Sequence, residues 1–245
     1  MILEVDAGNS RIKWRLLSSD SGVVQSRGVF ANKDLEFWLK ELDQISQVKK
    51  IRVSSVAGQY ALKQMSAYFS QRNWAFIEAQ TAKKTAGVTC AYTDPSTLGV
   101  DRWMGIVAAY NQFRSPCIIV DAGSAVSIDI IDGNGLHLGG YIMPGFEMGL
   151  QAILAGTSNV RVERLDFKEP MSFMPGHSTE QCLVRGQLLA VKSMVEHIFV
   201  GMQAKKIIPE IVLTGGNGEQ LVGVIDGFVH FESELVLNGL KFSIL

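Results

Sequence analysis

The sequence lacks the features that would assign it to nucleic-acid binding, to a membrane or to the secreted proteins. Its formal net charge is -1, whereas a nucleic-acid groove usually requires a basic surplus. The N-terminus has no basic flank, no long apolar segment and no cleavage signal of a secretory leader. No apolar run approaches the roughly 18 residues of a membrane span. We therefore expect no nucleic-acid partner and no membrane insertion.

Cysteine is also scarce. The three cysteines, Cys90, Cys117 and Cys182, are far apart and form no C-x-x-C pair. We expect reduced thiols in a cytoplasmic protein, and neither a zinc site nor a thiol nucleophile. The four histidines share no metal-ligand spacing either.

Two similar stretches dominate what the sequence does contain. Residues 2–14, ILEVDAGNSRIKW, and residues 117–132, CIIVDAGSAVSIDIID, align without gaps. In each, an apolar strand ends in Asp-Ala-Gly, and a second strand, a glycine-containing turn and a third strand follow. With 47% hydrophobic residues the chain can bury a sizeable core. The repeat predicts a duplicated domain, with halves 1–115 and 116–245.

The remaining segments alternate between helical and strand patterns. We predict helices over 32–45, 58–71, 101–113 and 178–202, and strands over 50–56, 73–79 and 210–216. The fold class is therefore α/β with mixed sheets, and two closely packed halves with a cleft between them. Gly139 and Gly140 indicate a bulge or a close backbone approach.

The repeated Asp-x-Gly turn suits phosphate chemistry. Backbone N–H groups of a tight turn bind phosphate, and glycine allows close approach. A carboxylate at the strand end repels phosphate but can hold a hydrated cation that neutralises it. Asp6 and Asp121 suit that task, Lys13 adds a positive charge, and hydroxyl or amide donors surround them: Asn9, Ser10, Ser124 and Ser127. A single Asp-x-Gly is more typical of an ordinary hairpin turn, but its duplication favours a nucleotide site.

Residues 92–103, YTDPSTLGVDRW, fit the acceptor side of a phosphoryl transfer. Such a transfer needs a group that accepts a hydroxyl proton, and Asp101 can do so. Arg102 can hold a carboxylate through two hydrogen bonds. The alternative is that Asp101 caps a helix and Arg102 is solvated. Thr179, at the start of the long helix, is also explained by capping alone.

Taken together, these motifs resemble the superfamily of acetate and sugar kinases, heat-shock ATPases and actin. More narrowly, the chain resembles the type III pantothenate kinases over nearly its whole length. The motifs that carry the resemblance occur in the family's order: DAGNSRIKW (6–14), GVDRW (99–103), DAGSAVSID (121–129), GGYIMPG (139–145) and LTGG (213–216). Serine stands at 10, 124 and 127, where threonine is common in the family.

The resemblance implies duplicated ribonuclease H-like domains with an ATP cleft between them. It implies ATP-dependent phosphorylation of pantothenate to 4'-phosphopantothenate, the first step toward coenzyme A. It also implies a homodimer, with the acceptor pocket near the interface, in the cytoplasm. The implied ATP contacts are Asp6, Ala7, Gly8, Asn9, Ser10, Arg11, Ile12, Lys13 and Ser124. The implied pantothenate contacts are Tyr92, Gly99, Val100, Asp101, Arg102 and Thr179, with Asp101 as the base. Asp6 would hold Mg2+ through water, and Asp121 would bind K+ or NH4+.

Two other hypotheses about the function remain open from the sequence. One is a different reaction on the same scaffold, such as a sugar kinase or a phosphatase. The other is a nucleotide-sensing accessory factor of transcription. The Gly-Val-Asp-Arg stretch argues against a phosphatase, which has no need of an arginine that binds a carboxylate. The acidic set Asp6, Asp101 and Asp121 favours catalysis, because a sensor needs no proton acceptor.

Overall fold

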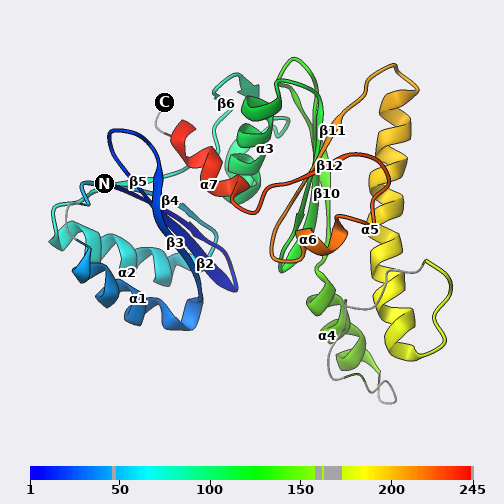
Figure 1. The fold of residues 1–245 in the computed structure, drawn as a ribbon, viewed down its shortest axis with the longest axis horizontal. Helices are drawn as coiled ribbons and strands as arrows, with labels where there is room; N and C mark the ends of the chain where they lie inside the picture. The colour runs from blue at the N-terminus through cyan, green and yellow to red at the C-terminus, as the bar shows by residue number, and fades with distance from the viewer. Residues whose placement is uncertain (46–47, 158–161, 163–172, 244–245) are drawn as a thin grey trace. The chain divides into compact units, whose positions relative to one another are not determined.

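The chain folds into two compact units with the same sheet architecture. The computed structural model describes residues 1–45, 48–157, 162 and 173–243. One unit comprises Met1–Asn111 with Glu234–Leu245, and the other comprises Gln112–Ser233 (Figure 1). Their sheets have the orders β3-β2-β1-β4-β5 and β10-β9-β8-β11-β12. The predicted duplicated α/β fold with mixed sheets is confirmed, whereas the division at 115/116 stays a prediction.

The first sheet has an apolar face covered by two helices. Antiparallel pairing joins its first three strands, and β4 and β5 add in parallel to β1. The strands are β1 (Ile2–Ala7), β2 (Arg11–Leu17), β3 (Val24–Ala31), β4 (Lys50–Ser55) and β5 (Ala75–Glu78). Leu3, Val5 and Val53 form a core with residues of α1 (Leu35–Glu41) and α2 (Gly58–Gln71). Both helices lie along the same side of this sheet in Figure 1.

The opposite face of the first sheet is polar and receives the end of the chain. Helix α7 (Leu235–Gly239) and the 3-10 turn η4 (Leu240–Phe242) pack against β1 and β4. The buried Arg15 joins them to the sheet, because it donates to Glu4 at 2.7 Å and to the Leu237 carbonyl at 2.9 Å. No local pattern in the sequence indicates this return of the C-terminal segment.

Helix α3 (Val100–Phe113) follows a segment of short elements. These are β6 (Lys84–Thr85), β7 (Val88–Thr89) and the 3-10 turn η3 (Pro95–Thr97). Helix α3 passes so close to α7 that a Cβ on Gly239 would lie 2.8 Å from the Met104 carbonyl carbon. Glycine is therefore required at position 239.

The second sheet repeats the first. Its strands are β8 (Cys117–Ala122), β9 (Ala125–Ile131), β10 (His137–Pro144), β11 (Glu210–Thr214) and β12 (Val229–Phe231). The predicted irregularity at the paired glycines is present, because the β9–β10 register shifts between His137 and Gly139, where φ is +109°.

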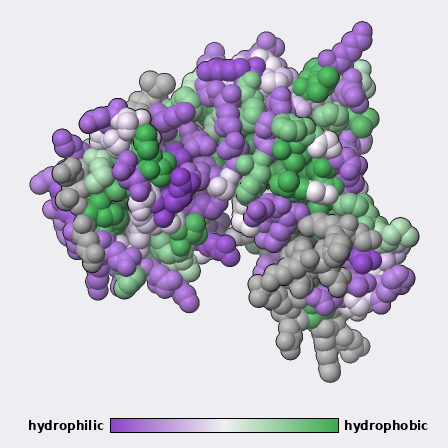
Figure 2. Space-filling model, in the orientation of Figure 1, coloured by the Kyte–Doolittle hydropathy of each residue, from purple (hydrophilic) through white to green (hydrophobic). Residues whose placement is uncertain are grey.

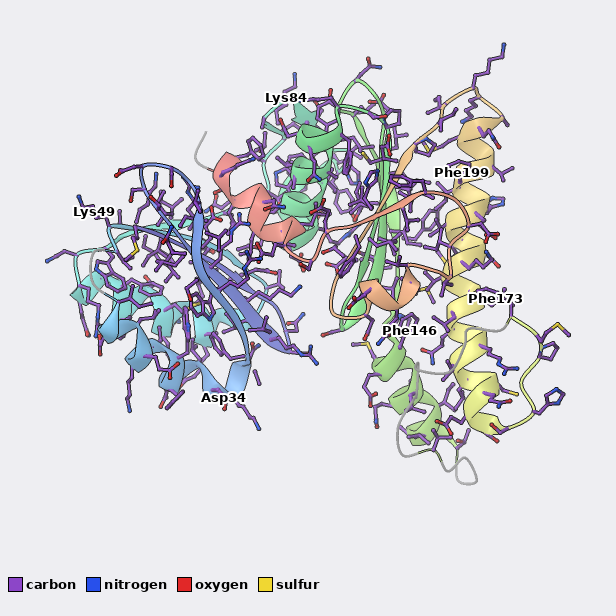
Figure 3. All side chains as sticks on the ribbon, in the orientation of Figure 1. Asp34, Lys49, Lys84, Phe146, Phe173 and Phe199 are labelled. Carbon is purple, nitrogen blue, oxygen red and sulfur yellow. The ribbon has the colours of Figure 1, made fainter. Side chains whose placement is uncertain are left out.

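Three helices accompany the second sheet: α4 (Phe146–Gly156), α5 (Thr179–Gln203) and α6 (Gly218–Leu221). Val120, Ile128 and Leu213 pack with Leu188 and Val191 of α5 in one apolar core. Hydrophobic side chains gather where α5 meets this sheet (Figure 2). Phe146 at the start of α4 and Phe199 on α5 belong to the same cluster (Figure 3).

The sequence located the long elements better than the short ones. The helix predicted over 58–71 is α2 without change of bounds, and the one over 178–202 is α5, shifted by one residue. The helix predicted over 32–45 is wrong in length, because α1 is flanked by 3-10 turns, η1 (Asn32–Asp34) and η2 (Leu42–Gln44). Among the described helices, none combines the length and apolarity that crossing a bilayer requires.

Candidate active site

The first Asp-x-Gly turn joins β1 to β2, and its aspartate lies on the polar face of the sheet. Asp6 lies in register between Lys13 of β2 and Ser54 of β4, so the three side chains share one face. Asp6 and Lys13 are half-buried, and the Ser54 hydroxyl is buried with no hydrogen-bond partner among the described residues. A carboxylate, a cation and a hydroxyl therefore stand side by side at the strand ends.

The turn itself is exposed. Gly8 donates its N–H to the Arg11 carbonyl at 3.0 Å, and Asn9, Ser10 and Arg11 face solvent. Ala7 and Ile12 are fully buried in the apolar core. Of the predicted ATP contacts, these two can therefore act only through their backbone.

The second turn repeats this geometry with different side chains. Asp121 lies in register between Ser127 of β9 and Thr214 of β11. The Gly123 N–H donates to the Ala125 carbonyl at 2.9 Å, and Ser124 at the tip is exposed. Where the first turn has Lys13 and Ser54 beside its aspartate, the second has two hydroxyls.

Two glycines from motifs far away in the sequence pack against the second turn. A Cβ on Gly215, where φ is +90°, would lie 2.6 Å from the Ala122 carbonyl carbon and would overlap the Asp121 carboxylate. Gly145 donates its N–H to the Ser124 carbonyl at 3.1 Å, and a Cβ there would overlap the same peptide. The sequence suggested a close backbone approach only at Gly139 and Gly140, and it did not reveal that Gly145 and Gly215 both contact this turn.

The acceptor side lies at the start of α3. Asp101 is the second residue of the helix, which begins one residue before the predicted start at 101. Its Oδ1 accepts the backbone N–H of Arg102 at 2.8 Å, and a Cβ on Gly99 would lie 2.7 Å from that oxygen. Arg102 Nη1 donates to the Tyr92 hydroxyl at 3.3 Å. Glycine at position 99 thus makes room for the carboxylate, and four predicted contacts, Tyr92, Gly99, Asp101 and Arg102, lie together.

The segment before α3 is held in place by specific hydrogen bonds. The buried Trp103 donates its indole N–H to Thr85 at 3.2 Å, and Thr81 donates to the Leu98 carbonyl at 2.9 Å. Lys83 donates to the carbonyls of Cys90 and Tyr92 at 2.9 and 3.1 Å. Lys83 was not predicted, because a lysine that supports a loop has no signature in sequence.

Thr179 begins helix α5 but does not cap it. Thr179 is the exposed first residue of α5, while the cap is Ser178, whose hydroxyl accepts the Gln181 N–H at 3.2 Å. The capping explanation therefore belongs to Ser178.

Burial, followed by the charge of Glu210, raises the pKa of Cys117 to about 12, so this thiol stays protonated at neutral pH.

The duplicated mixed sheets, with an Asp-x-Gly turn in each, match the actin-like α/β fold of ribonuclease H-like repeats. The class of protein is that of the ATP-using phosphotransferases. A sequence profile described as type III pantothenate kinase matches residues 2–200. The chain belongs to the type III pantothenate kinase family and phosphorylates pantothenate in coenzyme A biosynthesis.

Individual relatives agree with this assignment. The type III pantothenate kinase of Pseudomonas aeruginosa is 32% identical over 99% of this chain and 98% of its own length. That of Chromohalobacter salexigens is 34% identical over 89% of this chain and 77% of its own.

Solved structures support the fold alone. A Campylobacter jejuni protein assigned to the Baf family of transcriptional activators is 21% identical, with a TM-score of 0.61 over 98% of this chain and 95% of its own. The ethanolamine utilization protein EutJ of Carboxydothermus hydrogenoformans is 13% identical, with a TM-score of 0.52 over 99% and 88%.

Proposed function

We propose that Asp101 is the base of the pantothenate kinase reaction and that Arg102 binds the substrate's carboxylate. The arrangement at the start of α3 supports this proposal: Asp101 is oriented by the Arg102 N–H, and Arg102 is oriented toward Tyr92. Successive helical side chains diverge by about 100°. Asp101 and Arg102 can therefore bind opposite ends of one extended molecule, the hydroxyl and the carboxylate.

In this mechanism Asp101 takes the hydroxyl proton as the oxygen bonds to the γ-phosphorus of ATP, while the bond from that phosphorus to the β,γ-bridging oxygen breaks and ADP leaves. In the first unit, the turn at Gly8–Ser10 and Lys13 bind and orient the phosphate chain. Asp6 is a hard oxygen ligand at a strand end, so it fits a hydrated Mg2+, which neutralises phosphate charge when bound. Gly99, Val100 and Tyr92 complete the binding of pantothenate. In the second unit, Ser124 and Thr179 stay predicted contacts of ATP and of pantothenate.

Replacing Arg102 by methionine tests the carboxylate contact. We expect the KM for pantothenate to rise roughly 10- to 100-fold, because a charge-assisted bidentate contact is lost. The KM for pantothenol, which has an alcohol in place of the carboxylate, should change little. Both constants follow from a coupled ADP-release assay. An equal rise for both substrates would show that Arg102 does not recognise the carboxylate.

We propose that Asp121 binds a monovalent cation. One carboxylate flanked by the hydroxyls of Ser127 and Thr214 offers the oxygen ligands that K+ or NH4+ takes. Among the described residues, no group of three or more His, Cys, Asp or Glu side chains could hold a metal. The remaining ligands would therefore be neutral oxygens or phosphate.

Removing K+ is the corresponding experiment. We expect turnover in Na+ buffer to be roughly tenfold below that in K+ buffer, a loss of about 1.4 kcal/mol in stabilisation of the transition state. Thr214→Val keeps the shape but removes a hydroxyl, so it should raise the K+ concentration at half-maximal activity. Equal turnover in K+-free buffer would contradict the proposal.

We propose a homodimer that forms through the exposed side of α5. That side carries small or apolar residues: Cys182, Gly186, Leu189, Ala190, Val200 and Gly201. Nothing lies within 4 Å of a Cβ built on Gly186 or Gly201, so a partner helix has room to approach. Leu189 is 43% exposed in the single chain.

Light scattering tests this surface. We expect the wild type to have twice the chain mass of 26.8 kDa, and Leu189→Glu to shift the mass to that of a monomer. Phe37→Glu, which changes an exposed apolar residue of α1, is the control and should stay dimeric. A monomeric wild type at micromolar concentration would refute the proposal.

We also propose that the protein works in the cytoplasm, where its three free thiols would stay reduced. Recovery of the kinase from a periplasmic or extracellular fraction would contradict this location.

A further inference from the structure

Asn32 follows the edge strand β3 and lies beside the first Asp-x-Gly turn, because Ala31 pairs with Arg11. It opens η1, the 3-10 turn marked by Asp34 in Figure 3. Its side-chain Nδ2 donates to the carbonyls of Gly8 and Asn9, both at 2.8 Å. Its backbone N–H donates to the Ser10 carbonyl at 3.3 Å. Three successive carbonyls of the turn are therefore held by one residue.

This arrangement dictates where the N–H groups of the turn point. In a trans peptide the carbonyl and the N–H of the same plane lie on opposite sides. The carbonyls of Gly8 and Asn9 face Asn32, so the N–H groups of Asn9 and Ser10 face away from it. Both residues are exposed, and successive N–H groups with a common direction form an anion-binding concavity.

The orientation of the Asn32 amide is determined by its neighbours. Reversing the amide would place its oxygen against two carbonyl oxygens, which would repel it. In the orientation present, Asn32 Oδ1 is buried and has no hydrogen-bond partner among the described residues. A buried unpaired acceptor is unfavourable and calls for an explanation. The two bonds donated by Nδ2 supply that explanation.

We infer that Asn32 is a positioning residue for ATP. Its amide fixes the turn so that the N–H groups of Asn9 and Ser10 bind the polyphosphate of the nucleotide, while the adenosine is not affected. The inference rests on the proposed assignment of this turn to ATP. It adds a residue that touches neither substrate but sets the phosphate site through the backbone.

Calorimetry with ADP and with adenosine tests the inference on Asn32→Ala. We expect ADP affinity to fall roughly 10- to 100-fold, because two hydrogen bonds that order the turn are lost. Adenosine affinity should be unchanged. In the ADP-release assay the KM for ATP should rise, while the KM for pantothenate should stay within about twofold.

The variant Asn32→Asp gives a pH dependence of ADP affinity that a purely structural role of Asn32 would not produce. At pH 7.5 the carboxylate repels both carbonyls, so ADP affinity should fall at least as far as in Asn32→Ala. Burial against two carbonyl oxygens raises the pKa of the introduced carboxyl above its ordinary value of about 3.9, so lowering the pH to 5 protonates part of it and restores one donor. The ratio of mutant to wild-type ADP affinity should therefore recover as the pH falls. If Asn32→Ala does not fold, this recovery decides the question, and an unchanged ratio would overturn the inference.

Two further variants separate the possible failures. Asn111→Ala removes an amide that donates to the Ala86 and Val107 carbonyls at 3.0 and 2.9 Å, and should leave ADP affinity unchanged. Lys13→Met tests the assignment of the turn to ATP. If Lys13→Met weakens ADP binding while both Asn32 variants bind normally, the role of Asn32 is refuted. If none of the three changes ADP binding, the phosphate site lies elsewhere and both proposals fall.

Discussion

Replacing Asp101 by asparagine is expected to lower turnover by about 10²–10⁴-fold, the usual effect of losing a general base. Asparagine has nearly the same size and keeps an oxygen that can accept the Arg102 N–H, a bond of 2.8 Å in the wild type. The start of α3 should therefore stay intact. ATP binding should also survive, because Asp6, Lys13 and both phosphate turns are unchanged.

The measurement combines turnover by coupled ADP release with calorimetric ATP binding on the same preparation. Asp94→Asn is a suitable control, since Asp94 lies in the same segment and its carboxylate accepts the Ser96 N–H at 3.0 Å. We expect the control to stay within a few-fold of wild-type turnover. Near-normal turnover of Asp101→Asn would remove Asp101 from the mechanism. Joint loss of turnover and ATP binding would mean that Asp101 serves the structure instead.

Glu4→Ala is expected to destabilise the first unit by about 3–5 kcal/mol, the usual effect of breaking a buried ion pair. The Glu4 side chain is completely buried, and its two oxygens bind Arg15 at 2.7 Å and Arg52 at 2.9 Å. Arg15 also binds Glu234 at 3.0 Å and Asn238 at 2.7 Å. Removing Glu4 leaves the buried Arg15 and the half-buried Arg52 without this carboxylate.

Urea unfolding monitored by tryptophan fluorescence measures this effect selectively. All four tryptophans, Trp14, Trp38, Trp74 and Trp103, lie in the first unit. Glu36→Ala, which removes an exposed carboxylate of α1, should change stability by no more than about 0.5 kcal/mol. A transition midpoint for Glu4→Ala equal to that of this control would show that the buried network contributes little.

The duplicated architecture was readable from the sequence because it depends on local patterns. Each half opens with an apolar strand, Asp-x-Gly and a second strand, and hairpins of this kind form between neighbouring segments. Equal openings predicted equal sheets, and the two strand orders agree. The predicted start of the helix at 101 differs from the start of α3 by one residue, because sequence preferences do not fix a helix end to the residue.

The resemblance to a family identified the reaction, and the comparisons bear it out. The motifs at 6–14, 99–103 and 121–129 are short and continuous, so they can be recognised from the sequence without the tertiary structure. The roles of their individual residues remain predictions, since the fold places them but does not test their chemistry.

The sequence by itself determined the fold class and the places of the two Asp-x-Gly turns, because each is a short-range pattern of apolar periodicity, glycine and aspartate. Only the tertiary structure decided what surrounds them. Register placed Ser127 and Thr214 beside Asp121, and folding brought Asn32 to Gly8 and Glu234 to Arg15. Those contacts join residues far apart in the chain, and they arise from sheet pairing and packing that no local periodicity records.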